Sequence, residues 1–216
     1  MQGGEPAPDD EPGVIWDGRL GAAWFLGGVW TFDYPAHRLL FNGPARTGPS
    51  DPRCWEPLGF QVDSAGRRTN IFPRVAAVVA GDTIQFLLDT GARTDVTESA
   101  WPRIEPATPR HRAASFIGAA RFAEWHTRHP DWPVVEHAEA GSDSSAMIRV
   151  PSITVDGQAI GPVWFTERPT HSFATFMSQY TDRPVEGALG GSAWQYVTLI
   201  LDYPRARMAV LAHPQS

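Results

Sequence analysis

The tripeptide Asp89-Thr90-Gly91 directly follows residues 84–88, a mainly hydrophobic run typical of a buried strand. This order places a carboxylate at the end of the expected strand. An ionised carboxylate in apolar surroundings is costly, so the fold must supply hydrogen-bond donors, a second acid or both. The sequence therefore predicts an acid in an environment built for it.

Residues 75–88 predict a β-hairpin immediately ahead of this acid. Two β-prone runs flank Gly81-Asp82, a pair typical of a tight hairpin turn. Gly91 permits a close backbone approach, which lets neighbouring amides and the Thr90 hydroxyl reach the carboxylate. We therefore expect Asp89, Thr90 and Gly91 to form one site.

A second motif, Ala188-Leu189-Gly190, lies far downstream and leads into the strand-like residues 199–204. Together the two motifs resemble those of retropepsin and pepsin-like aspartic proteases, and of bacterial retropepsin-like proteins in particular. The resemblance covers about residues 70–212. It implies a mainly β fold, the acid protease barrel, with one or two short helices.

The resemblance also implies a role for each matching residue. Asp89 would carry the chemistry, Thr90 would contact the facing lobe, and Gly91 would shape the loop. Leu189 and Gly190 would pack beneath that loop.

Two further residues are implied to lie beside a bound substrate. Ala92 stands where many relatives have a serine whose hydroxyl bonds the carboxylate, so its presence predicts a less acidic pair of aspartates. Gly141 belongs to residues 140–145, the expected tip of a flap with arms at 134–137 and 146–150. An ordinary exposed turn is the alternative for this tip. Arg93 and Asp95 leave the substrate preference open.

An internal repeat indicates how the chain is organised. Residues 17–41 align without a gap onto residues 186–210, with seven identities that include Asp33-Tyr34-Pro35 and its counterpart at 202–204. We therefore interpret residues 1–41 as a partial N-terminal lobe, containing its closing strands and helix only. Residues 42–69 would be a linker, and residues 70–213 a complete lobe.

In a first lobe with the layout of the second, the catalytic aspartate would lie upstream of Met1. The expectation is therefore a chain whose upstream sequence, including any targeting signal, is missing, and the compartment stays open. Residues 1–10 lack the basic and apolar regions of a signal peptide, and no segment is long and apolar enough to span a bilayer.

Composition fits a β-rich globular protein rather than a nucleic-acid-binding one. The chain has 216 residues, 42% of them hydrophobic, with 20 glycines and 20 prolines, which favours short strands joined by turns. Its formal net charge of -6 gives no reason to expect nucleic acid. Cys54 is the single cysteine, so an intrachain disulfide is excluded.

Residues 112–128 and 170–180 have apolar side chains at near-helical spacing, so a helix is expected in each, with Thr170 as a cap of the second. Two histidines, His126 and His129, raise the alternative of a zinc site, but a solvated helix end fits better because neither His-Glu-x-x-His nor a cysteine pair is present. No metal and no cofactor is expected.

The expected reaction is hydrolysis of a peptide bond by water held between two aspartates, acting on a peptide or protein substrate. Because the chain contains one Asp-Thr-Gly, the second aspartate would come from a homodimer partner or from a missing N-terminal lobe. The alternative is a catalytically silent fragment or peptide-binding module in which Asp89 has no partner.

Overall fold

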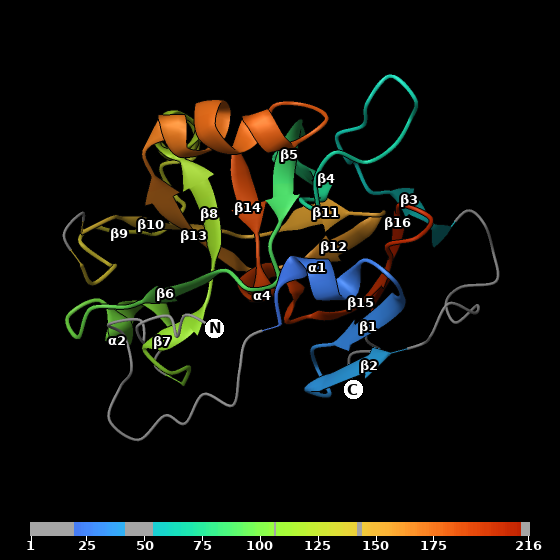
Figure 1. Ribbon diagram of the computed structural model, residues 1–216. Coiled ribbons are helices and arrows are strands. Elements are labelled where there is room, and N and C mark those ends of the chain that lie inside the picture. Colours follow the sequence, from blue (N-terminus) through green and yellow to red (C-terminus); the bar gives the residue numbers. More distant parts are fainter. Residues whose placement is uncertain (1–19, 42–53, 106, 142–143, 213–216) are drawn as a thin grey trace, which may run out of the picture.

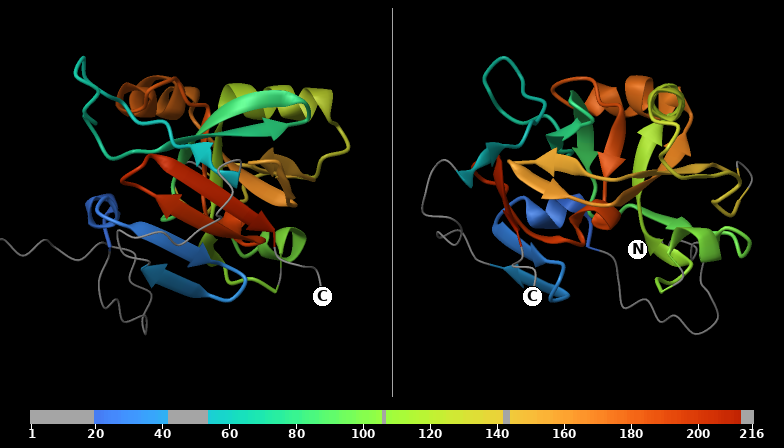
Figure 2. Two further views of the ribbon diagram at one scale, coloured as in Figure 1. Left: turned by 90° about the vertical axis from the view of Figure 1, so that its right-hand side faces the viewer. Right: turned by 180° about the vertical axis from the view of Figure 1, so that it is seen from behind.

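The computed structural model describes residues 20–41, 54–105, 107–141 and 144–212. The fold is mainly β with a few short helices, as expected. A nine-stranded sheet and a five-stranded sheet make up most of it, and the helices α3, η2 and η3 lie at the end of the larger sheet opposite the smaller one (Figures 1 and 2).

The larger sheet is open, so the expected closed barrel is wrong. Within the described residues, the strands at its two ends, β12 and β9, each pair with a single neighbour. Its order is β12 (Gln158–Ile160), β11 (Ile153–Val155), β4 (Arg74–Val79), β5 (Asp82–Leu88), β14 (Gly187–Leu189), β8 (Ser115–Gly118), β13 (Val163–Arg168), β10 (Met147–Val150) and β9 (Val134–Val135). A small pair, β6 (Arg93–Asp95) and β7 (His111–Ala113), lies apart from it.

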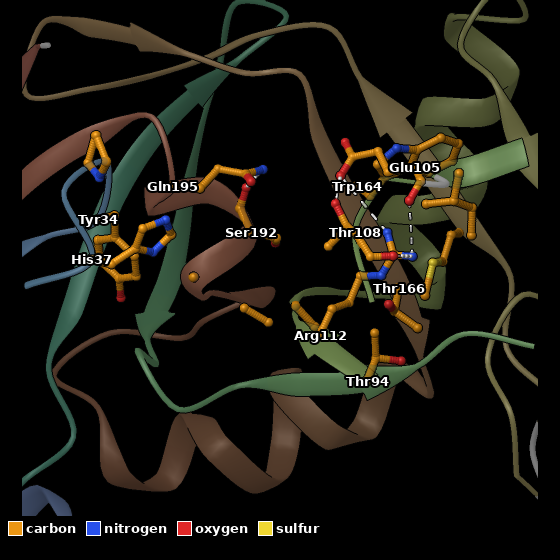
Figure 3. Close-up of a pocket in the computed structure, with 16 residues that line it drawn as sticks. Tyr34, His37, Thr94, Glu105, Thr108, Arg112, Trp164, Thr166, Ser192 and Gln195 are labelled. Atoms are coloured by element: carbon orange, nitrogen blue, oxygen red, sulfur yellow. Dashed lines mark hydrogen bonds and ion pairs between the residues drawn. The ribbon is translucent and has the colours of Figure 1, made fainter. Parts of the chain in front are cut away.

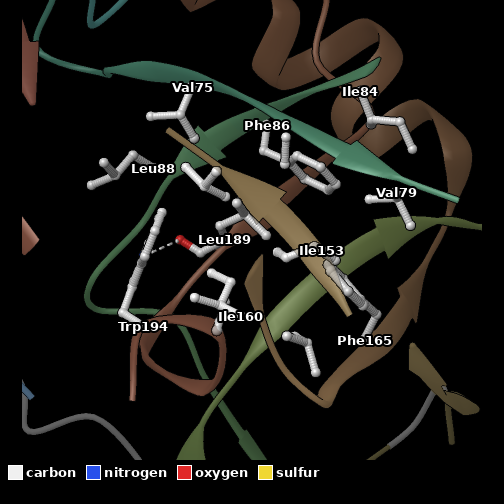
Figure 4. Close-up of a cluster of buried hydrophobic side chains, with 14 of the residues drawn as sticks. Val75, Val79, Ile84, Phe86, Leu88, Ile153, Ile160, Phe165, Leu189 and Trp194 are labelled. Carbon is white, nitrogen blue, oxygen red and sulfur yellow. Dashed lines mark hydrogen bonds between the residues drawn. The ribbon is translucent and has the colours of Figure 1, made fainter. Parts of the chain in front are cut away.

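The expected hairpin is present as β4 and β5. Ala80 and Gly81 have φ of 50° and 91°, the left-handed conformation that a tight hairpin turn requires. Inward-facing side chains of both strands are buried in the main core with residues of β11, β13 and α4 (Gly191–Trp194), as Figure 4 shows. Trp194 donates a hydrogen bond from its indole Nε1 to the Leu189 carbonyl at 3.2 Å. Burial of these side chains is the principal stabilising term for this part of the chain.

The helices differ in part from the expectation. Residues 111–118 form β7 and β8 rather than helix, and α3 (Ala119–Arg128) begins after them and ends at His129, as predicted. The second stretch is helical, as a π-helical turn η2 (Ser172–Phe176) followed by the 3₁₀ turn η3 (Met177–Tyr180). Thr170 accepts a hydrogen bond from the Ala120 amide at 3.0 Å, so it caps α3 instead of its own helix.

The described part of the expected linker, residues 54–69, is packed against the lobe. It contributes β3 (Glu56–Pro57), which pairs with β16, and it buries Leu58 and Phe60 in the main core. The remainder of that linker, residues 42–53, lies outside the described residues, as does residue 213 of the expected lobe. The lobe thus begins before residue 70.

The internal repeat is reproduced element by element. In residues 20–41, hereafter the first copy, α1 (Ala22–Phe25) is followed by β1 (Val29–Asp33) and β2 (Arg38–Phe41). In residues 189–210, the second copy, α4 is followed by β15 (Val197–Asp202) and β16, which runs on to residue 212 (Arg207–Ala212). A constant offset of 169, that of Asp33 from Asp202, relates the two copies. Residues 17–19 of the repeat lie outside the described residues.

The two copies meet about a local two-fold axis in the five-stranded sheet, whose order is β2-β1-β15-β16-β3. Strands β1 and β15 are antiparallel, and Thr31 pairs with its own repeat equivalent, Ile200. The pairs on either side are symmetry-related: Val29 with Asp202, and Thr198 with Asp33. The repeat is therefore a pseudosymmetric arrangement and not only a similarity of sequence.

Equivalent ion pairs follow the same symmetry. Arg38 Nη2 lies 2.6 Å from the Asp33 carboxylate, and Arg207 Nε lies 2.8 Å from the Asp202 carboxylate. Each acid also accepts a hydrogen bond from the amide of the residue three positions along the chain. The same side chains thus hold the same turn in both copies.

The turns themselves have the same backbone conformation. His37 and Ala206 have φ of 51° and 50°, a left-handed conformation that side chains other than glycine adopt infrequently. Their amides donate to the carbonyls of Tyr34 and Tyr203 at 3.0 and 3.2 Å. This agreement extends the repeat to single hydrogen bonds.

Candidate active site

Asp89 lies at the end of β5, beside the motif that the sequence analysis placed far downstream. β14 runs parallel to β5 with Leu189 next to Leu88, and the Asp89 amide donates to the Leu189 carbonyl at 2.9 Å. The Gly91 amide donates to Asp89 Oδ1 at 3.1 Å. The fold therefore brings together Asp89, Thr90 and Gly91 with Leu189 and Gly190.

Gly190 packs directly beneath this turn. A Cβ added to Gly190 would lie 1.9 Å from the Ala114 carbonyl oxygen, 2.9 Å from Ala92 Cβ and 3.0 Å from the Asp89 carbonyl oxygen. Its backbone is extended, with φ of -116°, so contact and not conformation requires glycine here. Its amide donates to Ser115 Oγ at 3.1 Å. The glycine of the downstream motif thus sets the position of the Asp89 turn.

Burial dominates the electrostatics of Asp89. It raises the pKa of this carboxyl above its ordinary value, while hydrogen bonding by the amides of Gly91 and Ala92 acts in the opposite direction. A carboxyl in such surroundings keeps its proton to higher pH than an exposed aspartate. Asp89 therefore has the property required of an acid that exchanges protons during a reaction.

Tyr34, which the sequence analysis did not place at this site, is electrostatically linked to it. Burial raises the pKa of Tyr34 far above its usual value, and the negative charge of Asp89 acts in the same direction. Burial raises the pKa of its repeat equivalent, Tyr203, to about 12. Both phenols stay protonated at neutral pH. Their place in the repeated Asp-Tyr-Pro was the available signal.

A cavity of about 500 Å³ opens beside Asp89 between the lobe and the first copy. Asp89, Thr90 and Gly91 line it from the lobe, and Leu20, Ala22 and Phe25 line it from the other side. Phe173 and Met177, which pack in a small apolar cluster with Leu87 and Ala188, also line this cavity. The acid thus faces a largely apolar space.

A second cavity, of about 420 Å³, lies on the other side of the Gly190 turn, where Gly191 and Ser192 line it (Figure 3). Arg112 enters it, with Nη1 3.9 Å from the Glu105 carboxylate. This Nη1 and Trp164 Nε1 are buried and donate no hydrogen bond within the part of the chain that the structure describes. Arg112 is therefore held at the wall of this cavity by an ion pair with Glu105, without a hydrogen bond from its buried Nη1 to any described residue.

The two residues expected beside a substrate, Ala92 and Gly141, line neither of these cavities. Ala92 is buried under the Gly190 turn, which explains a small side chain at this position, and it lines neither cavity. The expected flap arms do pair, as β9 with β10, but Gly141 lines neither cavity. The Ala140 amide donates instead to the Asp95 carbonyl at 2.7 Å. Residues 142–143 of the expected tip lie outside the described residues.

Metal ligation and membrane spanning were also considered for the described residues. Residues 20–41, 54–105, 107–141 and 144–212 contain no cluster of three or more His, Cys, Asp or Glu side chains suited to a metal ion. No helix of these segments is long and apolar enough to cross a bilayer.

Comparison with known proteins adds no assignment to this geometry. No family model matches the sequence, and no curated protein matches it.

Proposed function

We propose that the chain supplies one half of the active site of an aspartic endopeptidase with a pepsin-like fold. The observation that carries the proposal is the Asp89 turn. Asp89 is a partly buried aspartate of raised pKa that follows a hairpin strand. It accepts a hydrogen bond from the Gly91 amide, and its turn packs on Gly190. This arrangement suits a carboxyl that shares a proton with a second carboxyl.

In the proposed reaction, two facing carboxyls share one proton and hold a water molecule between them. The ionised carboxylate takes a proton from the water as its oxygen attacks the peptide carbonyl carbon, and the protonated carboxyl hydrogen-bonds the carbonyl oxygen. The tetrahedral adduct then breaks its C–N bond, and the leaving nitrogen receives the proton that the carboxylate took from the water, which restores the starting acid pair. Asp89 is one of the two carboxyls, and the Gly91 amide fixes its orientation.

The five-stranded sheet favours a second lobe over a homodimer as the source of the other acid. β1 pairs with β15 along its whole length, about the local two-fold axis. Two molecules that met about an equivalent axis, so that their Asp89 side chains faced each other, would have to displace β1 from β15. A segment that completes the first copy needs no such displacement.

The second candidate function is a peptide-binding module without catalysis. One observation favours it: the groups that shift the pKa of Asp89 are its buried surroundings and two backbone amides, with no other acid among them. An isolated carboxyl cannot form the shared-proton pair. This candidate predicts peptide binding without cleavage under all conditions.

The experiment is a designed two-lobed chain, in which a duplicate of residues 54–188 is placed directly before Leu20. The repeat offset makes this junction continuous with the first copy. Trp24→Ala, Leu40→Ala and Phe41→Val introduce the residues found at the equivalent positions of the second copy. The design presents two Asp89 turns to each other.

We expect the two-lobed chain to cleave peptides at acidic pH, as measured by mass spectrometry on a peptide mixture. Asp89→Asn in either turn should lower kcat by about 10³-fold or more, because both carboxyls take part in proton transfer. The natural chain is the control and should show no cleavage that depends on Asp89. A folded two-lobed chain without activity, or cleavage that survives Asp89→Asn, would contradict the proposal.

A further inference from the structure

The first copy exposes an unusual amount of apolar surface. Ten large hydrophobic side chains of the described residues are exposed, and half of them lie in residues 20–41. We call this group the open face; each member is between 43% and 59% exposed: Leu20, Trp24, Leu39, Leu40 and Phe41. Trp24 and Phe41 contact the ring of Trp30, so the face is continuous over α1, β1 and β2. Leu40 lies on the opposite side of β2, because successive side chains of a strand point to opposite faces.

The repeat shows what this surface would be in a complete lobe. The equivalent residues of the second copy are exposed by 3% or less: Leu189, Ala193, Met208, Ala209 and Val210. Position for position, the same elements are a solvent-facing surface in one copy and a core in the other. The open face is therefore half of a lobe core.

Named parts of the lobe cover the second copy. β3 pairs with the edge of β16, and Trp55 packs with Ala209. The Asp156 carboxylate accepts the Val210 amide at 2.9 Å, and β11 and β12 contribute to the same core as Met208. In the described residues, the equivalent strand β2 ends its sheet with no further neighbour. Within residues 20–41 and the other described segments, the first copy thus has no counterpart of β3 and of the β11–β12 hairpin.

The side of the first copy that faces Asp89 is also less closely packed than its equivalent in the second copy. A Cβ on Gly190 would collide with the Ala114 carbonyl oxygen and crowd the Asp89 turn, whereas a Cβ on its equivalent, Gly21, would meet nothing within 4 Å. The cavity of about 500 Å³ lies there, between Leu20 on one side and Asp89 on the other. By the local symmetry, this is where an Asp-Thr-Gly turn of the first lobe would rest.

We infer that the open face binds a polypeptide segment that repeats the fold of residues 54–188 and that seats its own Asp-Thr-Gly turn in the cavity between α1 and Asp89. The claim that this turn carries a second catalytic acid depends on the proposed function. The covering of the open face rests on the repeat and on burial, which are independent of any activity.

The first test uses the natural full chain in its own cells. A photo-cross-linking side chain replaces Phe41, and cross-linked peptides are sequenced by mass spectrometry. We expect them to come from a segment with Asp-Thr-Gly behind a hydrophobic strand, in the same polypeptide or in another. The control carries the cross-linker at Val62, which is equally exposed but outside the open face. Cross-links to another molecule of this chain, to an unrelated protein, or to nothing overturn the inference.

The second test measures amide hydrogen exchange in the two-lobed chain. The three substitutions in that chain serve only to match the first copy in shape to the duplicated residues 54–188 that cover it. Exchange of the β2 amides should slow by about 100-fold relative to the natural chain, because β2 gains a neighbour and a core. If the β2 amides exchange as fast in the two-lobed chain as in the natural chain, for any reason including a failure to fold, and the cross-linking result is also negative, the inference is overturned. Protection of β2 without peptide cleavage would remove the proposed function and leave the inference in place.

Discussion

Gly190→Ala will destabilise the protein by about 3 kcal/mol, a loss of about 10 °C in Tm. The added Cβ lies 1.9 Å from a backbone oxygen, that of Ala114, so no rotation of a side chain can relieve the contact. The backbone at Ala114 or at Gly190 itself must move instead. Thermal unfolding followed by circular dichroism measures the change.

Gly21→Ala is the matched control because Gly21 is the repeat equivalent of Gly190. Its backbone is also extended, with φ of -74°, and a Cβ there would meet nothing within 4 Å. We expect a change below about 0.5 kcal/mol. Equal effects of the two substitutions would contradict the asymmetry between the copies.

Met208→Asp will cost about 4 kcal/mol or more, because it places an unpaired carboxylate in the main core. The equivalent substitution, Leu39→Asp, should cost less than about 1 kcal/mol in the natural chain, since Leu39 lies on the open face. Urea unfolding of both variants gives the two free energies. A comparable loss at both positions would show that the open face is already covered.

The sequence was sufficient to predict features that depend on short patterns. Gly81-Asp82 predicted the hairpin because a tight turn limits which residues fit, and the offset between Asp33-Tyr34-Pro35 and its counterpart predicted the matching turns. The position of Gly190 beneath Asp89 came from the resemblance, and the contact of its missing Cβ now gives the physical reason.

Other features depended on partners distant in the chain. Residues 115–118 have helical spacing but form the strand β8, because β14 and β13 provide hydrogen-bonding neighbours on both sides. Leu58 and Phe60 are hydrophobic residues in a Gly-rich and Pro-rich stretch, a composition that predicts a linker. Their burial depends on the main core, which the sequence of this stretch does not reveal. The open edge of the nine-stranded sheet is likewise a property of the whole fold.

The structure brings Asp89, Thr90 and Gly91 together in one turn as the sequence predicted, but the surroundings of this turn were not predicted. Tyr34 lies near enough for the charge of Asp89 to act on it because the first copy pairs with β15, and no local pattern contains that information. Gly141 and Ala92 were placed beside the substrate by resemblance. In the structure Ala92 is buried at the turn, and the Ala140 amide, next to Gly141, donates a hydrogen bond to the Asp95 carbonyl, so their place beside a substrate stays a prediction.

The central claim, that Asp89 is one member of an acid pair, is tested most directly by titrating its carboxyl carbon by NMR in the natural and the two-lobed chains. In the natural chain we expect a single step, with a pKa above the ordinary value because of burial. In the two-lobed chain the facing carboxyls should titrate in two steps separated by more than about one pH unit, because they share a proton. A single step near 3.8 in both chains would contradict the account.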